Sequence, residues 1–94
     1  MIISFGQDKR ESKLAKHGLD LPDGGFVLRG TVFELPDDRS DYGENRWIAI
    51  GMLRALTVVC VFAEYEDEFR MISLRRAEPH ERKTYEQHLA RHHG

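Results

Sequence analysis

The run Leu56–Ala63 (LTVVCVFA) constrains the fold more than any other part of this sequence. It is continuously apolar and rich in β-branched residues, and it is far shorter than the roughly 18 apolar residues that a membrane-spanning helix needs. This pattern is typical of a central β-strand that is covered on both faces. Cys60 lies inside the run, so we expect it to be a small core residue whose thiol pKa is raised by its apolar surroundings.

Turn and capping residues divide the rest of the chain into short segments. Gly18 suits a left-handed helix end, and Pro22 and Pro79 suit the first turn of a helix. Helices are therefore predicted at residues 7–17, between Asp20 and Gly30, and at residues 79–91. Strands are predicted at residues 1–5, 31–35, 46–53, 56–65 and 69–75.

This order of segments predicts a single α+β domain over residues 1–94. Consecutive hairpins give an antiparallel sheet of about four to five strands, with two helices before it and one helix after it. No stretch has the pattern of a signal peptide or a membrane segment, so we expect a cytoplasmic protein that does not contact a membrane.

Charge is distributed unevenly along the chain, although its formal net charge is only −2. Residues 1–18 and 70–94 carry an excess of basic groups, whereas residues 19–69 carry an excess of acidic groups. If the two ends of the chain meet in space, they form a basic face that attracts phosphate. The alternative is that these charges only coat solvated helices.

Arginines are concentrated at the last predicted strand. Arg70 and Arg75 are candidates for binding a phosphate, because a guanidinium matches the geometry of its oxygens. A regular strand would point these two residues to opposite faces, so only one would face a given site unless the strand bends. Arg75, at the strand end, is the stronger candidate. The alternative for each arginine is an ion pair with Glu81 or Glu86 that holds the last helix to the sheet.

Lys16 and His17 close the first predicted helix, directly before Gly18. A helix C-terminus favours the charged form of an imidazole, which suits an acid or a phosphate contact more than a base. The alternative is that His17 only caps the helix and covers the edge of the core.

Three further candidates each have a structural alternative. Arg46 either reaches a phosphate or pairs with Asp41 or Glu44. Tyr85 is either a phenol near the phosphate or, as we favour, the apolar anchor of the last helix. Tyr65, at a strand end, is the better candidate for stacking on a base.

The first turn of the last predicted helix contains Glu81 and Arg82. Glu81 is a candidate base, although the helix dipole alone explains its position. Arg76 faces away from its neighbour on the strand and serves either a partner or a structural ion pair. His88 and His92 have a spacing that can bind zinc on a helix. Because no third ligand follows at a fixed spacing, no metal site is predicted.

Several of these segments resemble, in order and spacing, the BrnT family of toxins from bacterial type II toxin–antitoxin pairs. The resemblance covers nearly the whole chain. Three features depart from the family pattern: Phe5-Gly6 replaces a stretch containing Trp-Asp, Lys13 replaces an asparagine, and the loop between the strands that begin at Arg46 and Leu56 is shorter than usual. The resemblance is carried by Lys16-His17-Gly18, Arg46–Gly51, Arg70–Ala77, Glu81-Arg82 and Tyr85-Glu86.

The resemblance implies a RelE-like fold, a curved antiparallel sheet with helices on one side. It implies an endoribonuclease that cuts RNA without a metal or another cofactor and thereby arrests growth. It also implies a small partner, a BrnA-like antitoxin with a ribbon-helix-helix DNA-binding half. The complex of the two proteins would bind its own operator DNA.

Cleavage of RNA without a metal needs a base for the 2′-hydroxyl proton, cations for the crowded phosphate and an acid for the leaving 5′-oxygen. The competing hypothesis is a non-catalytic module whose basic face binds a partner protein and assists operator binding. The residues predicted to take part in catalysis are Arg75, His17, Lys16, Arg70 and Glu81. The residues predicted to bind RNA are Arg46, Arg76, Arg82, Tyr65 and Tyr85.

Overall fold

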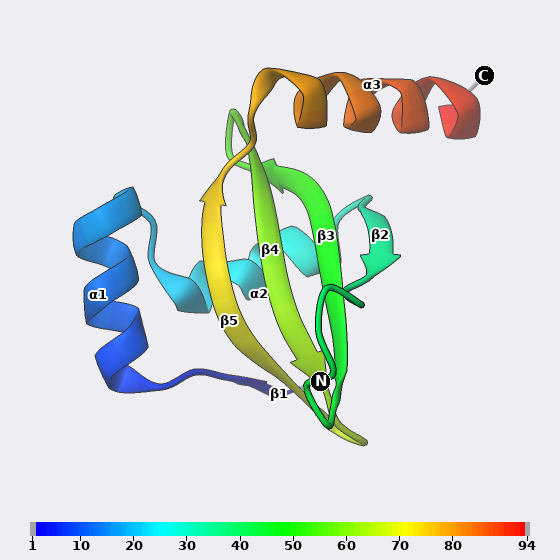
Figure 1. Cartoon of the computed structure of the whole chain (residues 1–94). Coiled ribbons are helices and arrows are strands. Elements are labelled where there is room, and N and C mark those ends of the chain that lie inside the picture. The colour runs from blue at the N-terminus through cyan, green and yellow to red at the C-terminus, as the bar shows by residue number, and fades with distance from the viewer. Residues whose placement is uncertain (1, 94) are drawn as a thin grey trace.

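Five strands, three α-helices and one short 3₁₀ helix make up residues 2–93, the part of the chain that the computed structural model describes (Figure 1). Met1, the expected start of the first strand, and Gly94, the expected end of the domain, lie outside this range. The strands are β1 (Ile2–Ser4), β2 (Phe33–Pro36), β3 (Asn45–Leu53), β4 (Leu56–Glu64) and β5 (Glu68–Arg76). The helices are α1 (Gln7–His17), the 3₁₀ helix η1 (Leu21–Asp23), α2 (Gly24–Arg29) and α3 (Pro79–His93).

The apolar run forms β4, which lies at the centre of the sheet in the strand order β1-β5-β4-β3-β2. Residues 58–63 of this strand are all buried. Cys60 is fully buried, and its pKa is raised to about 12 because burial disfavours the thiolate. The predictions of a covered central strand and of a core cysteine are therefore confirmed.

The sheet is mixed rather than antiparallel. Strands β2 to β5 form consecutive antiparallel pairs, but β1 runs parallel to β5, with Ile2 opposite Glu68 and Ser4 opposite Arg70. The antiparallel prediction is wrong for β1, because the sequence pattern identifies hairpins between neighbouring segments and the partner of β1 lies far along the chain. The α+β class is confirmed.

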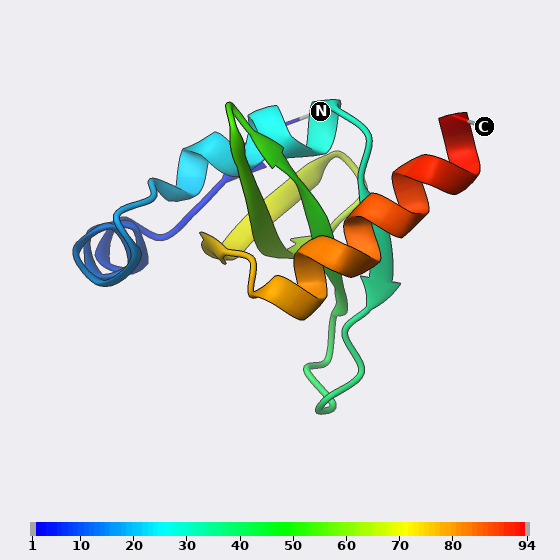
Figure 2. The same ribbon diagram turned by 90° about the horizontal axis from the view of Figure 1, so that it is seen from above.

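Helices cover both faces of the sheet (Figure 2). On one face, Leu21 of η1 and Val27 of α2 belong to the larger core cluster, together with Cys60 of β4. On the other face, Tyr85 of α3 packs in a smaller cluster with Val59, the neighbour of Cys60. Helices on one side only, which the family resemblance implies, are therefore a wrong expectation for this chain.

A β-bulge interrupts the pairing of β4 and β5. Val61 lies opposite Ser73, whereas the next residue of β4, Phe62, lies opposite Met71. Ile72 is thus an extra residue on β5 that has no partner of its own. The alternation of side chains along β5 is shifted by one position across the bulge.

The bulge brings two arginines onto the same face of the sheet. Arg70 lies opposite Ala63 and Arg75 lies opposite Val59, and these two residues of β4 are an even number of positions apart. Both arginines therefore point to the face on which α3 packs. The prediction that a regular strand would point them to opposite faces does not apply, because the strand is irregular.

Helix α1 ends where its sequence predicts. Gly18 has a φ of 69°, in the left-handed region, and its N–H donates to the carbonyl of Leu14 at 2.8 Å. None of the residues of α1 is buried, so the charged side chains of this helix are open to partners. No helix among residues 2–93 is both long and apolar enough to cross a bilayer.

Candidate active site

The side chain of Arg75 is fixed at the end of β5 by two hydrogen bonds. Its Nη1 and Nη2 atoms donate to Oε1 and Oε2 of Glu81, each at 2.8 Å. Oε1 of Glu81 also accepts the backbone N–H of Glu78 at 2.8 Å, as in a helix-capping box. A cation at a strand end is thus held rigidly by the carboxylate that begins α3, and the ion pair expected as the structural alternative is present.

This ion pair settles the charge of Glu81. Its pKa is lowered, chiefly by the hydrogen bonds from Arg75, so the carboxylate is ionised at neutral pH. Both of its oxygens are engaged by donors. This arrangement suits a group that positions Arg75 more than a group that removes a proton from a substrate.

The end of α1 is level with the end of β5 in Figure 1. The charge of Arg75 reaches His17, because it is the last of the four causes that lower the pKa of this imidazole. Burial is the largest cause, followed by the charges of Lys13 and Lys16. Partial burial and nearby cations therefore favour the neutral imidazole, which is the opposite of the charged form expected from the position at a helix end.

The loop before β3 contributes another cation, Arg39, whose charge acts on Arg75. Arg39 donates to the carboxylate of Asp37 at 2.7 and 2.8 Å, and the Asp37 side chain is fully buried whereas that of Arg39 is 64% exposed. The sequence analysis missed Arg39, since no periodic pattern predicts how an irregular loop folds back over a sheet.

A second group of candidates surrounds Glu44 at the start of β3. Arg46 donates to Oε2 of this carboxylate at 2.8 Å, and the hydroxyl of Tyr65 donates to Oε1. The guanidinium of Arg70 is 3.8 Å from Oε1. The pKa of Glu44 is lowered, first by the Tyr65 hydroxyl and then by Arg46. The ring of Tyr42, which the sequence analysis did not single out, lies 3.9 Å from the Arg46 guanidinium.

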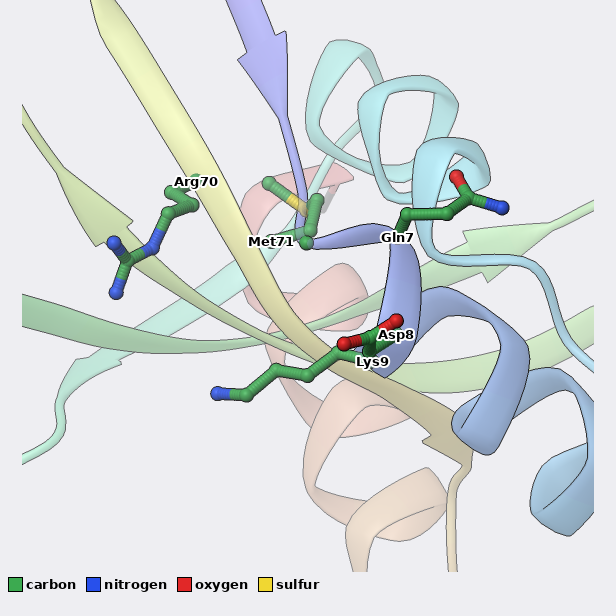
Figure 3. A pocket seen from close by; sticks show the side chains of 6 residues that line it. Gln7, Asp8, Lys9, Arg70 and Met71 are labelled. Atoms are coloured by element: carbon green, nitrogen blue, oxygen red, sulfur yellow. The ribbon is translucent and has the colours of Figure 1, made fainter.

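A hollow of about 410 Å³ lies where α1 begins beside β5 (Figure 3). The side chains of Lys9 and Arg70 extend in the same direction there, whereas Gln7 points away. Two cations of different elements therefore border one open space. The hollow is lined by Gly6, Gln7, Asp8, Lys9, Arg70 and Met71.

The family model described as ribonuclease toxin, BrnT, of type II toxin-antitoxin system matches residues 5–81. The chain belongs to the BrnT family. None of the curated proteins compared with the chain matches it. The family resemblance read from the sequence is confirmed, and a ribonuclease toxin that has an antitoxin partner follows from it. The matched range of this BrnT chain includes His17, Arg75 and Glu81.

The side chains of Tyr85, Arg76 and Arg82 form no hydrogen bond or ion pair with Arg75 or Glu81 within residues 2–93. Tyr85 is 4% exposed, and its hydroxyl donates to the carbonyl of Thr31 at 2.7 Å, so this phenol is used to anchor α3. Arg76 and Arg82 are exposed and form no ion pair with a carboxylate of residues 2–93. Of the predicted RNA-binding residues of this BrnT chain, Arg46 and Tyr65 share one partner, because both donate hydrogen bonds to the carboxylate of Glu44.

The two histidines whose spacing on a helix could bind zinc pack against each other with tilted rings. The rings of His88 and His92 are 4.3 Å apart between centroids, and His88 also packs edge-on against Phe33 at 5.2 Å. Among residues 2–93 of the BrnT chain, no group of three or more histidine, cysteine or acidic side chains is arranged to hold a metal ion. Packing accounts for this histidine pair.

Proposed function

We propose that this chain is an endoribonuclease that cuts RNA without a metal, at a site formed by the end of α1 and the end of β5. The observation that carries the proposal is the guanidinium of Arg75, which Glu81 fixes and whose charge acts on His17, an imidazole whose pKa is lowered so that its neutral form is favoured. A neutral imidazole can accept a proton, and a rigid cation can stabilise the charge that develops on a phosphate.

In the proposed mechanism, His17 accepts the proton of the 2′-hydroxyl as its oxygen attacks the adjacent phosphorus. Arg75 stabilises the additional charge on the phosphate oxygens, and Lys16 donates a proton to the leaving 5′-oxygen. The attack forms the new O–P bond as the bond to the 5′-oxygen breaks. The products are therefore a 2′,3′-cyclic phosphate and a 5′-hydroxyl end.

Glu81 acts in this proposal through Arg75. It fixes both terminal nitrogens of the guanidinium, so the cation does not reorganise when the phosphate arrives. The charge of Arg39 attracts RNA toward the same face. Arg76 and Arg82 are exposed and directly follow Arg75 and Glu81 in the sequence. They add to this attraction, and we assign them no contact with the reacting phosphate.

Arg70 takes a second phosphate of the same RNA strand. Arg75 and Arg70 share one face of β5, and their partners Val59 and Ala63 on β4 lie about 13 Å apart at roughly 3.3 Å per residue. Lys9 borders the hollow next to Arg70 and supplies a further cation. We assign no catalytic step to Arg70, because it lies too far along the strand from His17.

The finer properties that the resemblance implies are part of the same proposal. The antitoxin is a BrnA-like ribbon-helix-helix protein, and the complex binds operator DNA through that antitoxin. The fold is RelE-like, with the difference that α3 covers the face opposite α2. The RNA substrate places the active protein in the cytoplasm.

The test is cleavage of a single-stranded RNA oligonucleotide by the purified chain in excess EDTA. We expect products with 5′-hydroxyl ends, and we expect growth arrest on expression that the antitoxin relieves. The absence of cleavage together with harmless expression at a high level would contradict the proposal. That result would favour the non-catalytic module that binds a partner protein.

A further inference from the structure

An apolar hollow lies between the start of α2 and the turn that joins β3 to β4. Its volume is about 340 Å³. Phe26 is 61% exposed and Met52 is 41% exposed, and these two large apolar side chains lie together beside the hollow. We call Phe26, Arg29, Met52, Leu53 and Arg54 the hairpin patch.

Two unpaired cations border the hairpin patch. Arg54 lines the hollow, and the guanidinium of Arg29 lies 5.7 Å from the ring centroid of Phe26. Neither arginine forms an ion pair with any carboxylate of residues 2–93. A surface of this kind fits an apolar side chain that is flanked by carboxylates.

The backbone of Arg54 gives an independent reason to expect a role for its side chain. Its φ is 55°, and it is the single residue other than glycine with a positive φ within residues 2–93. This left-handed conformation favours glycine and is strained for a long side chain. Since glycine would form the same turn more easily, the structure gives the arginine side chain no folding role at this position.

We propose that the hairpin patch binds an acidic segment of the antitoxin, with an apolar side chain seated between Phe26 and Met52. The carboxylates of that segment pair with Arg29 and Arg54. A second copy of this chain is disfavoured, because a two-fold symmetric contact at the patch would bring the same two arginines of each copy together. The proposal rests on the family's antitoxin partner and not on the assignment of catalytic residues.

The side chains of the hairpin patch differ from those proposed to contact RNA. Val27, which follows Phe26, is buried against the face of the sheet that η1 and α2 cover. Met52 and Arg75 both point to the face where α3 packs, but Met52 has no part in the proposed cleavage. An antitoxin held at the hairpin patch therefore does not need to compete with the phosphate for the same side chains.

The first test compares charge reversals by calorimetric titration of the purified cognate antitoxin into the full-length chain. The double variant Arg29→Glu with Arg54→Glu is expected to bind at least about tenfold more weakly than the wild type. The control is Arg91→Glu, an exposed arginine near the end of α3, which is expected to bind within about twofold of wild type. RNA cleavage by the free double variant is expected to be unchanged.

Two further variants separate docking from folding. Arg54→Gly is expected to raise the melting temperature, because glycine relieves the left-handed strain, and to weaken antitoxin binding. Phe26→Ser is expected to weaken binding while the circular dichroism spectrum stays the same. Wild-type affinity in the double reversal and in Phe26→Ser would overturn the proposal.

Light scattering on the isolated chain supplies the remaining outcome. A dimer that Phe26→Ser converts to a monomer would assign the hairpin patch to a second copy and would also overturn the proposal. Failure of the wild-type chain to bind the antitoxin would do the same. Loss of RNA cleavage in all forms, with the antitoxin affinities as predicted, would instead count against the proposed catalytic function alone.

Discussion

Two ends of one sheet face carry arginines paired with glutamates, yet the two arrangements differ. At the end of β5, one carboxylate binds one guanidinium through both oxygens, and the charge of this guanidinium acts on His17. At the start of β3, the carboxylate of Glu44 accepts hydrogen bonds from Arg46 and from the Tyr65 hydroxyl, and it also forms an ion pair with Arg70. In the proposed mechanism the first end combines a fixed cation with a base. The second end has no such base: Arg46 and the Tyr65 hydroxyl hydrogen-bond to one carboxylate, and Arg70, 3.8 Å from the same carboxylate, supplies only a phosphate contact.

The difference teaches that a cluster of arginines is not by itself a cleavage site. The hollows around Glu44 are lined with other acidic side chains, among them Asp41, Glu64 and Glu66, which repel a phosphate. The charges that shift the pKa of His17 are those of Lys13, Lys16 and Arg75, which are all cations. In the proposed mechanism these cations have two effects: they attract the phosphate of RNA, and they lower the pKa of the imidazole so that it can accept a proton.

The largest expected difference between the two ends follows from removing an arginine at each. Arg75→Ala is expected to lower the rate of RNA cleavage by about 100-fold or more, because the developing charge on the phosphate loses its fixed cation. Arg70→Ala is expected to cost about tenfold or less, mainly in KM, because it removes a binding contact. Both rates are measured on the same oligonucleotide, with circular dichroism to verify folding. Equal losses in the two variants would break the distinction between the ends.

The next effect concerns the protonation of His17. Because its pKa is lowered from 6.5, the cleavage rate is expected to be level at neutral pH and to fall as the pH drops below that value. The rate falls in acid, and not in base, because a protonated imidazole cannot accept a proton. Lys13→Met removes one of the cations that lower the pKa, so it is expected to move the acidic limb toward higher pH.

A pH series of cleavage rates with wild type, Lys13→Met and His17→Asn checks this prediction. His17→Asn is expected to reduce the rate by about 100-fold and to abolish the acidic limb. An acidic limb that persists in His17→Asn would assign the base to another residue.

The smallest effect compares the two glutamates. Both pKa values are lowered from 4.5, so both carboxylates stabilise the folded state above about pH 4.5, and this contribution is lost as the pH falls below it. Glu81→Gln and Glu44→Gln are therefore both expected to flatten the loss of stability in acid. Only Glu81→Gln is expected to slow cleavage, by about tenfold, because it loosens Arg75.

Melting temperatures between pH 3 and pH 7 and cleavage rates at neutral pH separate these two roles. A Glu44→Gln variant that cleaves as slowly as Glu81→Gln would show that both ends of the face support the chemistry. The intended contrast depends on Glu44 being a structural group only.

Local features of the fold were predictable from the sequence because local physics determines them. Gly18 ends α1 in the left-handed conformation, as its lack of a side chain allows, and Pro79 begins α3. The continuous apolar run of β4 required cover on both faces, and the structure supplies it. The parallel pairing of β1 had no local signal, because its partner strand lies far away in the sequence.

The candidate site was predictable only as a set of residue types. Arg75, Lys16 and His17 were identified, but the charge state of the imidazole depends on burial and on cations that meet only in the folded chain. The bulge at Ile72 determines the face of the sheet to which Arg70 points. The sequence of this strand contains no residue that predicts a bulge. Arg39 was missed because its loop has no periodic pattern.

The pairing of β1 with β5 also determines when the site is assembled during synthesis. Residues 2–4 leave the ribosome long before residues 68–70, with which they pair. Until β5 has emerged, α1 has no strand to pack beside and His17 has no guanidinium next to it. On the proposed mechanism, we therefore expect a nascent or prematurely terminated chain that lacks β5 not to cleave RNA.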